Sequence, residues 1–98
     1  MDYEFEWDPR KAAGNLRDHA IAFEDACTVF ADPLAILIPD PDHSNVEERY
    51  LVLGMSTGGR LLVVAFGERG SRTRLISARR ATRRERREYE ESGRKPAI

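Results

Sequence analysis

Residues 48–66, with the sequence ERYLVLGMSTGGRLLVVAF, decide the fold because two short apolar runs flank a tight turn. The runs are Glu48–Met55 and Arg60–Phe66, and apolar runs of this length bounded by turn residues indicate strands. Between them, Gly58 and Gly59 supply the positive φ angles that a tight hairpin requires. The stretch therefore predicts two neighbouring antiparallel strands.

Further strands flank this hairpin on both sides. The apolar run Leu34–Ile38 precedes it and ends at an acidic loop of residues 39–45. On the other side, the turn residues 68–71 lead to a strand over Arg72–Arg79. We therefore predict four antiparallel strands in meander order.

The N-terminal segment predicts a strand followed by a helix. Tyr3–Trp7 alternates aromatic and acidic residues, so its rings share one face of a strand. Asp8 can cap a helix whose first residue is Pro9, and this helix is expected to run to about His19. The residues expected to pack inward are its apolar ones, Ala12, Ala13 and Leu16.

Two more helices are expected. Phe23–Phe30 has apolar residues at helical spacing and predicts a short second helix. Thr82 and Glu85 have the spacing of a capping box, so a last helix begins there and runs to about Ser92. Tyr89 is the only large apolar anchor of that charged helix.

The element order β-α-α-β-β-β-β-α predicts an α+β domain in which helices pack against one face of a twisted antiparallel sheet. A chain of 98 residues is long enough for one domain only. We assign residues 1–93 to that domain and residues 94–98 to a disordered tail.

Composition excludes several classes of protein. No apolar run approaches the roughly 20 residues that span a bilayer, and the acidic N-terminus is unlike a signal peptide, so a cytoplasmic protein is expected. The single cysteine, Cys27, cannot form an internal disulfide and is expected to be a buried small residue. No carboxylate cluster has metal-ligand spacing, although Asp40 and Asp42 would be the candidates, so neither a metal nor another cofactor is expected.

Charge is distributed unevenly along the chain. Residues 1–48 carry 12 acidic and 3 basic residues, whereas residues 49–98 carry 13 basic and 5 acidic residues. The densest basic run, residues 79–87, contains six arginines, whose planar guanidinium groups match phosphate oxygens. A surface for a nucleic acid is one interpretation, and a solvated helix with i,i+3 and i,i+4 ion pairs is the other.

Histidine is scarce, so each of the two is a candidate proton carrier. His19 ends the first helix, where it could equally act as a C-terminal capping residue. His43 lies in the acidic loop, where a surface residue is the simpler interpretation. Lys11 and Asn15 share a helical stripe with His19, and this stripe either binds a ligand or faces solvent.

Several spaced motifs run along the chain: Phe5-x-Trp7-Asp8-x-x-Lys11-x-x-x-Asn15-x-x-x-His19, Phe23-Glu24-Asp25-Ala26, Arg49, Gly54 and Ser77-Ala78-Arg79-Arg80-Ala81-Thr82-x-x-Glu85-Arg86-x-x-Tyr89. With these motifs the chain resembles the BrnT family of ribonuclease toxins. Together the motifs span the chain from Tyr3 to Glu91.

The resemblance implies a RelE-like fold and a metal-independent endoribonuclease that cleaves RNA and inhibits translation. It also implies neutralisation by a BrnA-type antitoxin, which usually carries a ribbon-helix-helix domain, so that operator DNA is bound only through the complex. By position, the implied catalytic residues are His19, Arg79 and Arg80. The implied substrate-binding residues are Lys11, Asn15, Arg49 and Glu85.

In the implied reaction the ribose 2′-hydroxyl attacks the adjacent phosphorus, which restricts the substrate to RNA. Arg79 and Arg80 would stabilise the phosphorane charge, and His19 would transfer protons. If His19 only caps its helix, Lys11 or Glu85 would handle the protons.

The chain departs from the family pattern at Asp18, where a lysine is usual, and at Gly67, where threonine or a similar residue is usual. Asp18 would put a negative charge beside the implied site. Two alternatives therefore stay open, a non-enzymatic binding module for a nucleic acid or the antitoxin, and a folded toxin that has lost its activity.

Overall fold

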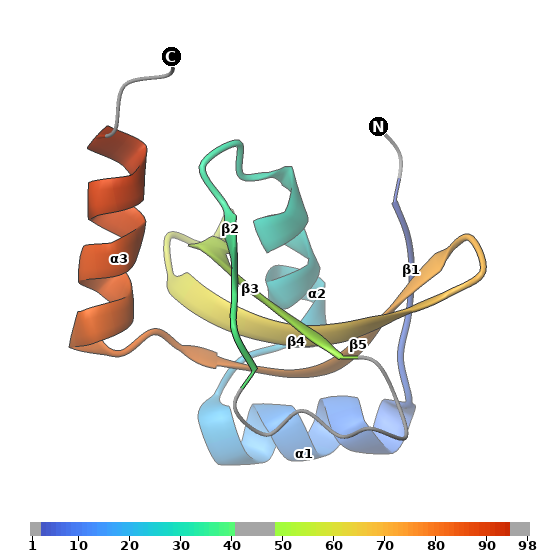
Figure 1. The fold of residues 1–98 in the computed structure, drawn as a ribbon. Helices are drawn as coiled ribbons and strands as arrows, with labels where there is room; N and C mark the ends of the chain where they lie inside the picture. The colour runs from blue at the N-terminus through green and yellow to red at the C-terminus, as the bar shows by residue number, and fades with distance from the viewer. Residues whose placement is uncertain (1–2, 41–48, 95–98) are drawn as a thin grey trace.

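The computed structural model describes residues 3–40 and 49–94, which form one mixed sheet with helices on both faces (Figure 1). The element order is the predicted one, and the α+β class is confirmed. The elements are β1 (Glu4–Glu6), α1 (Pro9–His19), α2 (Phe23–Ala26), the 3-10 helix η1 (Cys27–Ala31), β2 (Ile36–Ile38), β3 (Tyr50–Met55), β4 (Leu61–Arg69), β5 (Arg72–Arg80) and α3 (Arg83–Arg94).

The sheet has the strand order β1-β5-β4-β3-β2. Strands β2 to β5 form the predicted antiparallel meander. The prediction of a wholly antiparallel sheet is wrong at β1, which pairs in parallel with β5 and places Phe5 opposite Thr73. Alternation along a strand determines which residues share a face but not the direction of the neighbouring strand. The Glu6 carboxylate accepts a 2.7 Å hydrogen bond from Arg74 of β5 across this pair.

One face of the sheet, the helix-covered face, packs against α1, α2 and η1 (Figure 1). The central side chains of this core are Phe23 from α2 and Val29 from η1, which pack against alternate residues of the sheet. The sheet residues in this cluster are Val52, Leu62, Val64, Phe66, Leu75 and Ala78.

Helix α1 begins and ends where the sequence predicts. The Asp8 carboxylate accepts a 2.7 Å hydrogen bond from the Arg10 amide, and Ala20 ends the helix in the left-handed conformation. Its inward face differs from the prediction, because Ala13 and Leu16 are exposed and the buried residue is Asn15. The buried position of this helix is thus taken by Asn15 and not by the two apolar residues.

The single helix predicted over Phe23–Phe30 is wrong, because the structure divides this segment into two helical pieces. Helix α2 ends at Ala26, and the chain tightens into η1. The Asp25 carboxylate, at the end of α2, accepts hydrogen bonds from Ser56 Oγ and from the Gly58 amide at 2.9 and 3.1 Å. A Cβ atom at Gly58 would lie 2.8 Å from that carboxylate, so the close approach requires glycine. The helical segment is thus bonded through Asp25 to the turn between β3 and β4.

Helix α3 packs on the face opposite α1, which corrects the prediction that the helices share one face. Its Tyr89 contacts a cluster formed by Leu53, Leu61 and Val63, and donates a 2.6 Å hydrogen bond to Asp32. Burial and the Asp32 carboxylate raise the pKa of Tyr89 to about 12, so its hydroxyl remains a donor. Tyr89 is the anchor that the sequence predicts.

Helix α3 begins where the sequence predicts and ends later than predicted. The capping box is confirmed, since the Thr82 amide donates to Glu85 at 2.9 Å and the Glu85 amide donates to Thr82 Oγ1 at 3.2 Å. The helix continues through Gly93 to Arg94, two residues beyond the predicted end at Ser92. Residues 95–98, the rest of the predicted tail, lie outside the described residues.

Candidate active site

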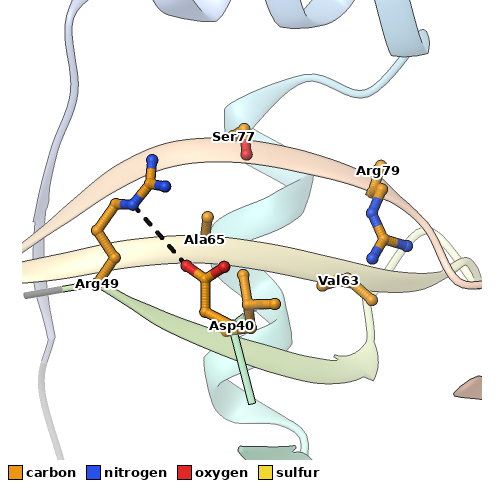
Figure 2. Close-up of a pocket in the computed structure, with 7 residues that line it drawn as sticks. Asp40, Arg49, Val63, Ala65, Ser77 and Arg79 are labelled. Carbon is orange, nitrogen blue, oxygen red and sulfur yellow. Dashed lines mark ion pairs between the residues drawn. The ribbon is translucent and has the colours of Figure 1, made fainter. Parts of the chain in front are cut away.

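The face of the sheet opposite α1, called the open face below, carries a hollow of about 220 Å³. We call this hollow the sheet groove. Figure 2 shows Arg49 at one end and Arg79 at the other, with Val63 and Ala65 of β4 between them. Its lining residues are Asp40, Arg49, Leu51, Val63, Ala65, Ser77 and Arg79. The groove therefore places two cations at the ends of a partly apolar floor.

A β-bulge determines which arginine of β5 faces the groove. Opposite Ala65 and Phe66 of β4 the register shifts, so that these residues pair with Ser77 and Leu75 and Ile76 is skipped. Leu75 and Ala78 are consequently both buried on the helix-covered face although they are three residues apart. Bulges of this kind redirect the side chains beyond them. Ser77 and Arg79 therefore turn to the open face.

Glu85, in the first turn of α3, binds the guanidinium group of Arg79. The two parallel hydrogen bonds, Nη1 to Oε1 and Nη2 to Oε2, are 2.8 and 2.9 Å long. These bonds, with the Thr82 amide, lower the pKa of Glu85 to about 2 despite its partial burial. They also raise the pKa of Arg79. Arg79 is therefore a fixed, permanently charged donor at this end of the groove.

Arg49 and Asp40 form the other end of the sheet groove. The Arg49 Nε atom lies 3.8 Å from Asp40 Oδ2, and both side chains are largely buried (Figure 2). Asp40 follows β2 and Arg49 precedes β3, so neighbouring antiparallel strands bring the two together. This end of the groove can hold an anion at the guanidinium and a proton at the carboxylate.

The structure does not bring the three implied catalytic residues together. Arg79 lines the sheet groove, whereas Arg80 is the next residue along β5 and belongs by alternation to the helix-covered face. His19 is an exposed residue at the end of α1, which packs against that same face. Any role for His19 or Arg80 would thus be exerted from the opposite side of the sheet.

The implied substrate-binding residues are likewise divided. Arg49 lines the groove, and Glu85 binds Arg79 beside it. Lys11 is exposed on α1. Asn15 is only 6% exposed, donates to the Ile21 carbonyl at 2.9 Å and accepts from the Ala78 amide at 2.9 Å. It is a link between α1 and β5 and not part of an exposed stripe.

Asp18, one of the departures from the family pattern, has little bearing on the groove. Asp18 lies on α1 and pairs with its neighbour Arg17 at 3.0 Å, which lowers the pKa of the Asp18 carboxyl. Its negative charge is thus neutralised on the surface away from Arg79. His43 and Asp42 lie outside the described residues.

Sequence reasoning missed Ser77 and the apolar floor of the groove. Ser77 stands in the quoted C-terminal motif, but its face depends on the bulge. Val63 and Ala65 alternate with Leu62 and Val64 in a run that is apolar throughout, so no pattern distinguishes the groove floor from the core. The sequence indicates no role for Asp40 other than that of a candidate metal ligand.

Two structural findings bear on membranes and metals. No helix over residues 3–40 and 49–94 is long and apolar enough to cross a membrane. Within these same ranges, no three His, Cys, Asp or Glu side chains are grouped so that they could hold a metal ion.

A groove with guanidinium groups at both ends and an apolar floor suits a polyanion with flat bases, since arginine matches phosphate oxygens and apolar side chains can pack against the face of a base. The model of a family described as the ribonuclease toxin BrnT of type II toxin–antitoxin systems matches residues 7–85. The chain belongs to the BrnT family. The matched segment includes Arg49, Arg79 and Glu85, and therefore both ends of the sheet groove.

A solved structure of a BrnT protein has the same fold. The 1.1 Å crystal structure of the Brucella abortus ribonuclease toxin BrnT superposes with a TM-score of 0.64 and 24% sequence identity, covering 84% of this chain and 100% of that one. A comparison with curated proteins gives no match. BrnT proteins are ribonuclease toxins of type II systems, which confirms the sequence-based prediction of a toxin with an RNA substrate and an antitoxin partner.

Proposed function

We propose that this BrnT family member is a metal-independent endoribonuclease whose cleavage site is the sheet groove. The observation that carries the proposal is the placement of Arg49 and Arg79 at the two ends of one hollow on the open face. Two guanidinium groups can hold a phosphodiester and stabilise the additional negative charge of a pentavalent phosphorane. No metal is needed for that task.

The proposed reaction is an in-line attack by the ribose 2′-hydroxyl on its own 3′-phosphorus. The O2′–P bond forms and the P–O5′ bond breaks, which gives a 2′,3′-cyclic phosphate and a free 5′-hydroxyl. Arg79 binds the non-bridging oxygens, and Ser77 beside it can donate a hydrogen bond.

Proton transfer is assigned to Asp40 in this proposal. Glu85 is a poor base because its oxygens already accept hydrogen bonds from Arg79 and its pKa is about 2. Among residues 3–40 and 49–94, Asp40 is the carboxylate that lines the sheet groove itself. It accepts the proton of the 2′-hydroxyl, and the departing 5′-oxygen takes a proton from water.

Family membership also supports a proposal about the partner. A BrnA-type antitoxin with a ribbon-helix-helix domain would neutralise this toxin in the cytoplasm, and operator DNA would be bound only through that complex. Co-expression of such an antitoxin should restore growth and should co-purify the toxin.

Digestion of purified total RNA in EDTA, without ribosomes, tests the proposed site. Wild type should cleave, and Arg79→Ala should lose activity by about 100-fold or more, as when a transition-state donor is removed. Arg80→Ala is the matched control, because it changes the same residue type one position along on the opposite face. Circular dichroism would establish that both variants are folded.

Other outcomes would contradict the proposal. Loss of activity in Arg80→Ala and His19→Ala, with Arg79→Ala still active, would move the site to the helix-covered face. If wild type binds the RNA and leaves it intact, a binding module or an inactive toxin is the correct interpretation.

A further inference from the structure

The sheet groove does not end at Arg79. A second hollow, of about 450 Å³, adjoins it, and the two share Leu51 and Arg79. We call this second space the side hollow. Ile38, Pro39 and Leu51 form its apolar wall, and the first two turns of α3 form the facing wall. A strand of RNA with its phosphate at Arg79 would therefore place a neighbouring nucleotide here.

The wall formed by α3 presents two charged side chains that the proposed reaction does not use. Arg84 is 86% exposed, and its Nε atom lies 3.8 Å from Glu88. Glu88 is 48% exposed. A loose surface pair of this kind contributes little and is easily exchanged for a ligand. Glu85, in contrast, is held by Arg79 and Thr82 at distances of 2.8 to 2.9 Å.

We propose that the side hollow is a base-binding subsite that prefers guanine next to the cleaved phosphate. This inference rests on the proposed function and names the substrate feature that the same site recognises. Single-stranded RNA is read by stacking of splayed bases and by hydrogen bonds to their Watson–Crick edges. Pro39 and Leu51 provide the apolar surface for the face of the base, and Glu88 reaches its edge.

The preference for guanine follows from the chemistry of a carboxylate, which only accepts hydrogen bonds and does so with two oxygens. Guanine presents two adjacent donors, N1–H and the N2 amino group, to such a pair. Adenine and cytosine present one amino group on that edge. Uracil presents one N–H between two carbonyl oxygens. These oxygens are acceptors, as the carboxylate is, and so they are repelled by it.

Arg84 has a different role in this subsite. Its exposed guanidinium can bind the phosphate beyond the recognised base, because phosphate contacts position an RNA without reading its sequence. Arg84→Ala should therefore raise KM for all substrates to a similar extent and leave the base preference unchanged.

The test measures kcat/KM for short single-stranded RNAs that differ only in the nucleotide beside the cleaved bond. Wild type should prefer guanine to uracil by about tenfold, as a good bidentate base contact provides. Glu88→Gln should bring this ratio close to one, because the amide group has only one acceptor oxygen. Glu91→Gln is the matched control, since Glu91 is an exposed residue of the same helix that does not line the hollow.

The outcomes separate this inference from the proposed function. If wild type cleaves none of the RNAs, the proposed function fails. If wild type cleaves them without preference, or if Glu88→Gln retains the preference, the subsite is refuted while the ribonuclease stands. A purely structural effect of Glu88 would lower all rates equally and leave the ratio unchanged, and Glu88→Ala provides a second variant to establish this.

Discussion

Arg79 keeps its orientation because Glu85 binds it through two parallel hydrogen bonds and is itself held by the Thr82 amide. The sequence predicts half of this arrangement. The spacing of Thr82 and Glu85 identifies the capping box, because a cap depends on residues close together in the chain. The two hydrogen bonds that Arg79 donates to Glu85 could not be predicted, because they depend on the face of the sheet to which Arg79 turns.

The ion pair between Arg79 and Glu85 should make the stability of the protein depend on pH. The folded-state pKa of Glu85 is about 2, below its ordinary value of 4.5, so the stabilisation is complete above about pH 4.5 and is lost as the pH falls toward 2. We expect the pair to contribute roughly 2–3 kcal/mol, after allowing for the exposure of Arg79. Between pH 6 and pH 2.5, the free energy of unfolding measured in urea should fall less for Glu85→Gln than for wild type.

The other carboxylates titrate in wild type and in Glu85→Gln alike, so their contributions to the pH dependence of stability cancel in that comparison. The pKa of Asp32 is also lowered, since hydrogen bonds from Met55 and Tyr89 outweigh the effect of its burial, but it titrates in both proteins. Thr82→Ala removes the smallest of the interactions that lower the pKa of Glu85 and keeps the ion pair and the bond from the residue 82 amide, so it should retain most of the wild-type pH dependence. If the free energy of unfolding changes with pH equally for wild type and Glu85→Gln, the ion pair is not the source of this pH dependence.

At the scale of elements, α1 shows what a sequence pattern determines and what it does not. Asp8 and Pro9 determine where the helix starts, because capping is a local interaction. Its buried side depends on what lies beneath it, and there the backbone of β5 requires a hydrogen-bond partner. Asn15 is therefore buried and Leu16 is 54% exposed, the reverse of what polarity alone predicts.

Replacement of Asn15 by alanine should destabilise the protein by about 2–4 kcal/mol, because the Ala78 amide and the Ile21 carbonyl would be left buried without partners. Lys11→Ala is the matched control, one turn earlier and exposed, and should change stability by less than about 0.5 kcal/mol. Thermal and urea unfolding measure both. A loss below about 0.5 kcal/mol for Asn15→Ala would show that the link does not hold α1 to β5.

The bulge in β5 is a second feature of the elements that could not be predicted from the sequence. Strict alternation from Leu75 would place Ser77 and Arg79 on the helix-covered face and Ala78 on the open face. One skipped residue, Ile76, reverses this arrangement. The candidate arginines could thus be named from the sequence, but the choice between Arg79 and Arg80 required the register.

At the scale of the whole molecule, the uneven charge of the chain is partly neutralised by folding. Strand β1 from the acidic half lies beside β5 from the basic half, where Glu6 pairs with Arg74 and, at 3.6 Å, with Arg72. The hydrogen bond from Arg74 lowers the pKa of Glu6. The exposed arginines of α3 stand on the other side of the molecule from this pair (Figure 1). Charge in the sequence therefore predicts a basic surface but not its boundaries.

Mapping the surface to which RNA binds would show whether the substrate lies in the sheet groove. Amide shifts of the isotope-labelled protein would be followed by NMR during titration with a 2′-O-methyl oligoribonucleotide, which cannot be cleaved because its attacking hydroxyl is blocked. We expect the largest shifts at Val63, Ala65 and Ser77, which line the groove on the open face. Largest shifts at Ala12 and His19, on the opposite side, would contradict this expectation.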